Sequence, residues 1–391
     1  MKFQNGRAKP YRVSYRDDDR REHQKSFARK ADAEHFLDDV HAKLRTGEYV
    51  DPKRSRLTVG AWSETWMAGR VDLKPKTIAG YESLLKTRVL PKWENVELVR
   101  VRNAEIVAWV ASMRAEGLSA QRTRHAYYVL SSMLDAAVRD RRITSNPAAG
   151  VDLPRLPKSE RQYLTHAKLA DLASACGDYE LFVLVLGYCG LRFGEAAALR
   201  VKRADTMRGR LTIAEAVTEI NGRAVFGTPK THGARAVVVP KFLRDRLVEH
   251  LAGRSADDLV FASPRGDVLR SNNFRRRVWN PACVSVGLRT YAEQKGKKKA
   301  PLYRGLVPHE MRHTAASIAI ASGANVKAVQ QMLGHASAAM TLDRYGHLFP
   351  DDLDAVADRI DAAARASADE RAGSARGSAI AEVIDLHAKE A

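Results

Sequence analysis

The chain has only three cysteines among 391 residues, at Cys176, Cys189 and Cys283. An odd count without metal-ligand spacing predicts reduced thiols that pack as small hydrophobic side chains, not a disulfide framework or a cysteine-based zinc site. Long apolar runs are also missing, because no stretch reaches the ~18 residues that cross a membrane. The N-terminus lacks the apolar core of a signal peptide. Together these absences predict a cytoplasmic protein.

Acidic residues are too few to balance the basic ones. The chain carries 65 Lys and Arg against 46 Asp and Glu, a net charge of +19 with a pI near 9.9. Such an excess predicts a polyanionic partner, either nucleic acid or an anionic membrane surface. Because no membrane segment is present, nucleic acid is the better partner. The length predicts two to three domains.

The N-terminal residues 1–52 predict a small three-stranded sheet plus one helix. Residues 10–28 alternate in strand fashion around a turn at Asp17-Asp18-Asp19. A helix follows with Gly47 just past its end. One stripe of this helix is apolar: Ala33, Phe36, Leu37, Val40 and Leu44. So small a unit is marginally stable alone.

Residues 56–150 predict a helical bundle. Thr58 is the expected cap of its first helix, and further helices are expected over 76–91, 103–117 and 119–142. An extended linker is expected over 151–162, which contains two prolines. Four basic side chains of the bundle are candidates for contact with a DNA backbone, with a solvated surface charge as the alternative for each: Lys74, Lys76, Arg122 and Arg124.

Residues 163–350 predict a mixed α/β domain, followed by an acidic, alanine-rich tail at 351–391. We expect a helix capped by Thr165, a buried helix over 181–189, and helices from about residue 240 to the tail. Strands are expected between them, over 211–213, 217–220 and 236–239, with turns at Asn221-Gly222 and 231–233. The expected fold class is therefore α+β and mainly α, with a small antiparallel sheet in the last domain.

Six polar residues of this last domain stand in short local frames. The frames are Gly-Leu-Arg-Phe-Gly-Glu (190–195), Pro-Lys-Thr-His-Gly (229–233), His-Glu-Met-Arg-His (309–313), Leu-Gly-His (333–335) and Arg-Tyr-Gly-His (344–347). The six residues are Arg192, Lys230, His309, Arg312, His335 and Tyr345. A phenol titrates near pH ~10, so its attack on a phosphate at neutral pH needs a base and positive charge at the phosphate. Guanidinium groups suit two non-bridging phosphate oxygens at once.

The stretch His309-Glu310-x-x-His313 also matches the zinc-protease pattern. His309 and His313 would share one helix face, but a metalloprotease needs a third ligand, and Arg312 would repel Zn²⁺. Nothing in that interpretation explains the net charge or the other frames. We therefore interpret the stretch as part of a phosphate site, in which His309 and Arg312 are neighbours at i and i+3.

These frames, in this order, resemble the tyrosine recombinases, the phage integrase family of DNA strand-transfer enzymes. The resemblance implies that Tyr345 is the nucleophile, giving a 3′-phosphotyrosine, and that Arg192 and Arg312 are the catalytic arginines, with Glu195 holding the first. It implies that Lys230 protonates the leaving 5′ oxygen. It also implies that His309 transfers a proton or contacts the phosphate, and that His335 hydrogen-bonds to it. Neither ATP, nor a metal, nor another cofactor is implied.

The resemblance extends to domains and partners. It implies that residues 1–52 form an arm-type DNA-binding domain, although a helix-capped hairpin that packs on its neighbour is the alternative. Residues 56–150 would be a core-binding domain, and the protein a homo-tetramer on double-stranded DNA attachment sites in a bacterial host cell. An excisionase and a host DNA-bending protein are possible further partners, and the tail could pack on a neighbouring subunit. Lys297 and Lys298, in a basic loop, are candidates for a phosphate contact or a solvated loop.

Three alternatives stay open at this point. A type IB topoisomerase-like enzyme uses a similar site to relax DNA, and a DNA-binding protein that has lost catalysis would keep the domains. For Tyr345 alone, a buried structural tyrosine is the alternative, although its flanking residues, Leu342-Asp-Arg-Tyr-Gly-His, favour a polar setting.

Overall fold

The computed structural model describes residues 2–4, 8–17, 20–46, 49–51, 56–156, 162–229, 233–288, 291–292, 302–303, 305–349 and 357–371. Contacts divide the chain into two units. The first comprises Met1–Glu160 with Glu219–Arg223, and the second comprises Arg161–Thr218 with Ala224–Ala391.

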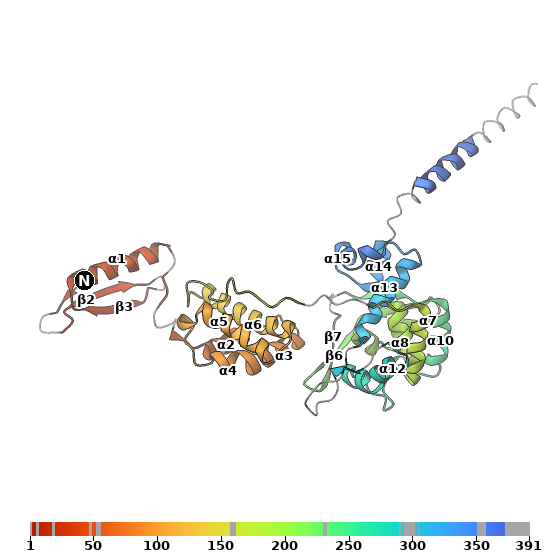
Figure 1. The fold of residues 1–391 in the computed structure, drawn as a ribbon, viewed down its shortest axis with the longest axis horizontal. Coiled ribbons are helices and arrows are strands. Elements are labelled where there is room, and N and C mark those ends of the chain that lie inside the picture. The colour runs from red at the N-terminus through yellow and green to blue at the C-terminus, as the bar shows by residue number, and fades with distance from the viewer. Residues whose placement is uncertain are drawn as a thin grey trace, which may run out of the picture. The chain divides into compact units, whose positions relative to one another are not determined.

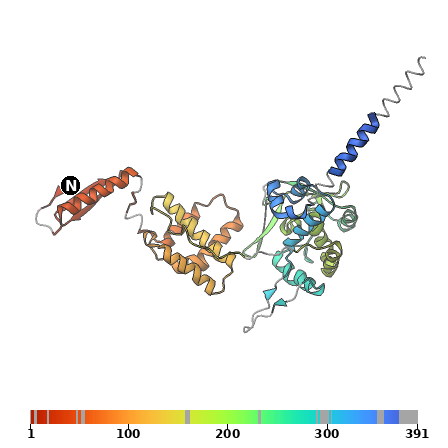
Figure 2. The same ribbon diagram turned by 45° about the horizontal axis from the view of Figure 1, so that its top comes forward.

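The first unit begins with a three-stranded antiparallel sheet and one helix. The elements are β1 (Lys2–Phe3), β2 (Tyr11–Arg16), β3 (Glu22–Phe27) and α1 (Lys30–Thr46), with strand order β1-β2-β3. Strand alternation puts Val13 and Tyr15 on one face, where they are buried together with Ala33 and Val40 of α1. Figures 1 and 2 show α1 lying along the strands. The predicted strands and helix are confirmed.

A helical bundle follows in the first unit. Its elements are α2 (Val59–Ala68), α3 (Pro75–Leu84), the π-helical turn η2 (Leu85–Val89), α4 (Leu90–Trp93), the 3₁₀ turn η3 (Leu98–Arg100), α5 (Asn103–Ala115) and α6 (Ala120–Arg139). Thr58 caps α2 as predicted, because its side chain accepts a hydrogen bond from the amide of Ala61. Trp62, Trp66 and Trp93 are buried in the bundle core against α6 residues such as Met133.

The helix predicted over 76–91 is interrupted, because α3 passes into the π turn η2 before α4 begins. Pro91 does not end the helix but lies in the first turn of α4. Proline has no amide hydrogen to donate. The wider π turn lengthens the backbone hydrogen-bond spacing, so that the amide of Leu90 donates to the carbonyl oxygen of Leu85. The same arrangement occurs in the second unit, where a π turn precedes Pro281.

The linker begins later than predicted. Val151 is buried in the bundle core and Leu153 packs against it, so the chain does not leave the bundle at residue 151. Residues 152–156 form no regular element, and 157–161 lie outside the described residues. Asn146 closes the bundle, since its side-chain amide donates to Asp135 at 2.7 Å.

The second unit is mainly helical with short strands. Its first half comprises α7 (His166–Ala175), η4 (Gly177–Tyr179), α8 (Glu180–Cys189), α9 (Phe193–Ala197), η5 (Val201–Arg203), β4 (Ala204–Asp205), β5 (Arg210–Ile213), β6 (Ala216–Ile220), β7 (Arg223–Gly227), β8 (Arg235–Val238) and α10 (Lys241–Leu251). Its second half comprises α11 (Ser271–Phe274), η6 (Arg275–Trp279), α12 (Asn280–Ser285), β9 (Tyr291–Ala292), β10 (Leu302–Tyr303), η7 (Pro308–Glu310), α13 (Met311–Ala321), α14 (Val326–Leu333), α15 (Ala338–Tyr345) and η8 (Gly346–Leu348). One further helix spans 357–371.

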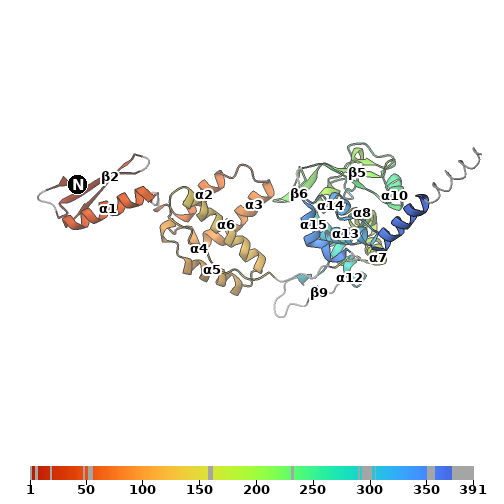
Figure 3. The same cartoon turned by 90° about the horizontal axis from the view of Figure 1, so that it is seen from above.

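Helix α8 is the centre of this unit. Nearly all its residues are buried, as its continuous apolar sequence predicted, and it packs against α7, α10 and α13. Figure 3 shows α8 and α13 close together. Thr165 caps α7, again as predicted. The three cysteines are free and buried, and burial raises the pKa of both Cys176 and Cys189 to about 12.

In the described residues the strands of this unit form three small antiparallel sheets. One has the order β4-β5-β8, with Leu211 opposite Val237, another is the hairpin β6-β7, and the third pairs β9 with β10. Asn221 and Gly222 both have positive φ at the hairpin turn, as predicted for an Asn-Gly turn. The prediction of helices only after residue 240 is wrong, because β9 pairs with β10. Among the described residues, none of the helices combines the length and hydropathy that a membrane crossing requires.

Candidate active site

The loop after α8 brings Arg192 to the start of α9. Gly190 ends α8 in the left-handed conformation, with φ 65°. A Cβ at this position would lie 2.8 Å from Cδ2 of Leu333, so the loop also needs glycine for space. A second glycine, Gly194, lets α9 approach β6, because a Cβ there would lie 2.3 Å from the carbonyl oxygen of Val217.

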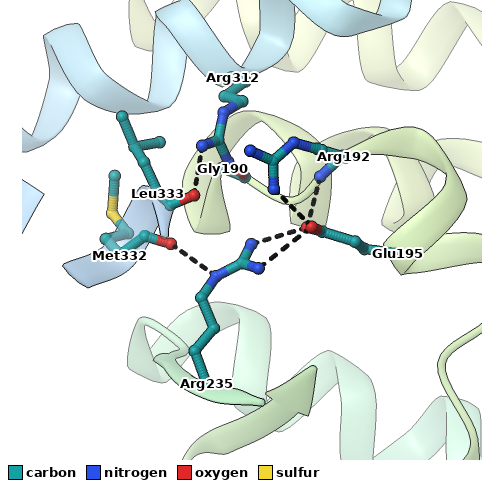
Figure 4. A network of polar contacts seen from close by, with 7 residues as sticks. All are labelled: Gly190, Arg192, Glu195, Arg235, Arg312, Met332 and Leu333. Atoms are coloured by element: carbon teal, nitrogen blue, oxygen red, sulfur yellow. Dashed lines mark hydrogen bonds and ion pairs between the residues drawn. The ribbon is translucent and has the colours of Figure 1, made fainter. Parts of the chain in front are cut away.

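Glu195 is clamped between two arginines. Its carboxylate accepts hydrogen bonds from Nη1 and the backbone amide of Arg192, at 2.7 and 3.0 Å. It also accepts from Nη1 and Nη2 of Arg235, at 3.1 and 2.6 Å (Figure 4). Glu195 is only 1% exposed. Burial opposes its ionisation, but the hydrogen bonds and charge of Arg235, with those of Arg192, outweigh it and lower the pKa of Glu195 to about 2.

Arg312 is buried beside these residues on α13. Its Nη1 donates to the carbonyl oxygen of Gly190 at 2.7 Å, and its Nη2 donates to the carbonyl oxygen of Leu333 (Figure 4). Arg312 therefore joins the loop that carries Arg192 to the end of α14. Burial, with the positive charge of Arg192, lowers the pKa of Arg312 to about 9. The guanidinium still carries its charge at neutral pH.

His335 follows α14 and faces the same region. Its Nδ1 lies 2.9 Å from the hydroxyl of Thr341. Its Nε2 is buried and has no hydrogen-bond partner among the described residues. Burial, with the charge of Arg312, lowers the pKa of His335 to about 4, so the ring is neutral at pH 7. A buried ring nitrogen without a partner is suited to an oxygen of a bound phosphate.

Tyr345 is the last residue of α15 and is fully buried, with 0% exposure. Its ring lies in a small apolar cluster with residues such as Ile320 and Val329. The ring also stacks on His335, with centroids 6.2 Å apart and planes 5° apart. Its hydroxyl lies 2.8 Å from Nδ1 of His313. The flanking sequence favoured a polar setting, and the structure differs: the ring is enclosed by apolar residues and two imidazoles.

The zinc-protease pattern does not form a metal centre in the described residues. The rings of His309 and His313 share one face, with centroids 6.0 Å apart. Glu310, however, accepts a hydrogen bond from the amide of Val307 at 2.6 Å, and His313 contacts Tyr345. In the part of the chain that the structure describes, the group with metal-ligand spacing lies far earlier in the sequence, where His23 of β3 meets Asp17, just after β2, and Asp51, after α1. There His23 already pairs with Asp17 at 2.8 Å.

The remaining sequence candidates are distributed as follows. Lys230 and the pair Lys297 and Lys298 lie outside the described residues. Lys74 and Lys76 lie at the start of α3, and Arg122 and Arg124 lie in the first turns of α6, which contacts α3.

Two residues at the site, Arg235 and His313, were not predicted as site residues from the sequence. Arg235 starts β8, which pairs with β5, and only the fold brings it to Glu195, 40 positions earlier. The available signal was a charged residue at the start of the apolar run Arg-Ala-Val-Val-Val (235–239). His313 was considered only as part of the zinc pattern.

Comparisons with known proteins assign the class. Residues 162–351 match the phage integrase family. The prophage phiRv2 integrase of Mycobacterium tuberculosis is 28% identical over 358 residues, which cover 88% of this chain and 90% of that protein. The integrase of Mycobacterium phage D29 is 26% identical over 356 residues, covering 86% and 89%.

Two solved structures share the fold. The Tn1549 transposon integrase in complex with transposon right end DNA has a TM-score of 0.65 at 20% identity, covering 78% of this chain and 99% of that one. A lambda integrase dimer bound to a COC′ core site has a TM-score of 0.56 at 19% identity, covering 85% and 91%.

These likenesses define the class of protein, an enzyme that breaks and rejoins DNA strands. Residues 162–351 of the chain belong to the phage integrase family of tyrosine recombinases.

Proposed function

We propose that the chain is a site-specific recombinase that integrates, and also excises, the DNA of a phage or mobile element through a 3′-phosphotyrosine. The observation that carries this proposal is the meeting of Arg192, Arg312, His335 and Tyr345 around one point, from four separate parts of the second unit. Arg312 holds the loop of Arg192 through the carbonyl of Gly190, and His335 stacks on Tyr345. Two guanidinium groups beside a phenol are suited to a phosphodiester and its attack by the phenol.

The reaction we propose is an in-line displacement at phosphorus. The oxygen of Tyr345 forms a bond to phosphorus as the bond to the 5′ oxygen breaks, and Lys230 gives that oxygen its proton. Arg192 and Arg312 neutralise charge on the non-bridging oxygens. We infer that the hydroxyl of Thr341 donates to Nδ1 of His335, which leaves the proton on Nε2 for a phosphate oxygen. His309, one turn before His313, would contact the phosphate or transfer a proton.

Burial of Tyr345 adds one requirement. A ring with 0% exposure cannot reach a phosphate, so we propose that DNA binding displaces the C-terminal part of α15 and exposes the hydroxyl. The helix is short and begins after a Ser337 cap, and its movement would release Tyr345 from Ala316 and Ile320 of α13.

We further propose roles for the other parts of the chain. Residues 1–52 would bind arm-type DNA sites, and residues 56–150 would bind the core site through Lys74, Lys76, Arg122 and Arg124. Residues 163–350 would carry catalysis, with Lys297 and Lys298 as additional phosphate contacts. A homo-tetramer on two DNA sites is proposed because a lambda integrase of the same fold was solved as a tetramer bound to a Holliday junction. An excisionase and a host DNA-bending protein would set direction in the bacterial cytoplasm.

Covalent trapping tests the proposal. A pool of nicked duplexes of randomised sequence serves as the probe, because release of the nicked fragment prevents rejoining. We expect an SDS-stable protein–DNA adduct with the wild-type chain and none with Tyr345→Phe. No adduct with the wild-type chain would leave a DNA-binding protein without catalysis, and an adduct with Tyr345→Phe would exclude this nucleophile. Relaxation of any supercoiled plasmid, without sequence preference, would favour the topoisomerase alternative.

A further inference from the structure

A histidine and two aspartates from three separate segments meet in the sheet-and-helix part that begins the first unit. His23 is on β3, Asp17 directly follows β2, and Asp51 lies beyond the end of α1. Each side chain offers one donor atom, a ring nitrogen or a carboxylate oxygen, and these atoms all lie within 4.8 Å of one another. Figure 1 shows the elements that these segments border, β2, β3 and α1.

The three side chains are withdrawn from solvent, unlike most acidic residues of a protein surface. The side chain of Asp17 is 7% exposed and that of His23 is 13% exposed, and Asp51 is 9% exposed. Burial of a carboxylate is costly unless its charge is compensated, and two carboxylates at this spacing repel each other. With a neutral imidazole the three groups carry two negative charges, which one divalent cation balances.

The donor groups are held in place by their neighbours. The ring of His23 stacks on Tyr15, with centroids 5.3 Å apart and planes 17° apart, and it meets Tyr49 edge-on at 6.2 Å. The backbone amide of Arg21 donates to Oδ1 of Asp17 at 2.8 Å, and Oδ2 of Asp17 lies 2.8 Å from Nε2 of His23. Neighbours that fix the orientation of ligand side chains are a regular part of metal sites.

We propose that Asp17, His23 and Asp51 bind one divalent transition-metal ion, with Zn²⁺ as the best match to these ligands. This inference goes beyond the recombinase function proposed above and does not depend on it. Zn²⁺ accepts an imidazole nitrogen and carboxylate oxygens at about 2.0–2.2 Å, and a water completes the four-coordinate shell. The donor atoms of such a site are about 3.4 Å apart, so side-chain shifts of about 1 Å form it. Mg²⁺ and Ca²⁺ fit less well, because both take oxygen ligands.

The ion would act as a structural staple, because this part of the chain has a small core. In the described residues that core consists of Val13, Tyr15, Ala33, Val40 and Tyr49. So small a core stabilises a fold weakly, and small domains commonly add disulfides or a metal. A disulfide cannot form here, since all three cysteines of the chain belong to the second unit. The metal would join the turn after β2, strand β3 and the segment after α1.

Zinc binding by the full chain tests the inference. The chain is freed of metal with EDTA and titrated with Zn²⁺ near neutral pH, in competition with a chromophoric chelator. We expect one tight zinc site per wild-type chain, and we expect that site to be lost in both His23→Gln and Asp51→Asn. Asp51→Asn keeps the shape of the side chain but removes its charge, so it tests the ligand with little change in packing.

Hydrogen exchange locates the ion in the same full chain. Amides of β2, β3 and α1 should exchange more slowly with zinc than in EDTA, whereas α13, which carries the zinc-protease pattern, should not change. The slowing should be about 100-fold when free zinc is held about 100 times above its dissociation constant, because a ligand that binds only the folded form stabilises it in that proportion. Exchange is compared with and without zinc within each variant, so a variant with a weakened fold remains informative.

A matched control lies on α1. Asp39 accepts a hydrogen bond from Lys43 at 2.7 Å, but these side chains are 52% and 50% exposed and lie outside the cluster. Asp39→Asn removes a carboxylate from the same part of the chain. It should bind zinc as tightly as the wild-type chain does.

Three results would each overturn the inference. The first is no zinc binding by the wild-type chain, which is the outcome if Asp17 and His23 form only a hydrogen-bonded pair. The second is an unchanged zinc affinity in His23→Gln and Asp51→Asn, and the third is zinc-dependent protection outside β2, β3 and α1 alone. Covalent trapping tests the recombinase function separately, so either proposal can fail while the other stands.

Discussion

Replacement of Arg235 by Met should destabilise the second unit strongly, although Arg235 belongs to none of the sequence frames. The substitution removes both hydrogen bonds from this arginine to Glu195, at 3.1 and 2.6 Å. It also removes the contact of Nε with the carbonyl oxygen of Met332 at 3.4 Å. Methionine fills much of the same volume, so the main effect is the loss of a partner for a carboxylate that is 1% exposed. Breaking a buried ion pair from one side costs about 3–5 kcal/mol.

The pKa of Glu195 gives an independent magnitude. In the folded chain this pKa is about 2, against an ordinary value of 4.5. At about 1.4 kcal/mol per pKa unit, the difference stabilises the fold by about 3 kcal/mol at pH 7. Because the folded pKa is the lower one, this stability is present above pH 4.5 and is lost as pH falls toward 2. Arg192 retains part of it, so we expect Arg235→Met to cost about 2–3 kcal/mol at pH 7, and less at pH 3.5.

Hydrogen exchange of the amides of α8 and α13 in the full chain measures this loss, because it reports the opening of the second unit alone. The matched control is Arg246→Met. Arg246 bonds to Glu180 at 2.9 Å, but both side chains are about 40% exposed, so its loss should cost less than about 1 kcal/mol. The reasoning is refuted if Arg235→Met costs no more than the control, or if its cost is the same at pH 7 and pH 3.5.

Two further substitutions test the space and the hydrogen bonds of the site. Gly194→Ala should destabilise the second unit by about 3 kcal/mol, as overpacking does, because the new Cβ would meet the carbonyl oxygen of Val217 at 2.3 Å. A thermal melt measures this loss. Gly227→Ala is the control in the same melt, because the space around Gly227 is open. Thr341→Val removes the hydroxyl that we infer donates to Nδ1 of His335, and should slow adduct formation about 10- to 100-fold, equivalent to about 1–3 kcal/mol. An unchanged adduct rate in Thr341→Val would show that this hydrogen bond does not orient His335.

Local chemistry explains which parts of the fold were predictable. Thr58 and Thr165 cap their helices through contacts three residues away, and Asn221-Gly222 forms its turn without help from distant residues. The continuous apolar run of α8 likewise predicts a buried helix from local sequence alone. The break before Pro91 was not predicted, because a π turn keeps the helical direction and leaves the same pattern of side chains. The short pair β9-β10 has too few residues to show a strand period.

Contacts between residues far apart in the sequence explain which features of the site were not predicted. Residue types and order pointed to Arg192, Arg312 and Tyr345, because each role needs a particular functional group. The partners of these groups depend on the fold, since Arg235 reaches Glu195 only after β8 pairs with β5. Burial of Tyr345 likewise follows from how α15 packs beside α13 and α14, not from its polar neighbours in sequence.

Arg235 also connects the segment of Arg192 with the residues just before His335. Arg235 is the first residue of β8. The same guanidinium fills the space beside Gly334, where a Cβ would lie 2.8 Å from Cδ of Arg235, and Gly334 immediately precedes His335. Glu195 links this arginine to Arg192. The buried carboxylate and Arg235 thereby join the chain segments that carry Arg192 and His335, and a change at Arg235 should disturb the positions of both residues at once.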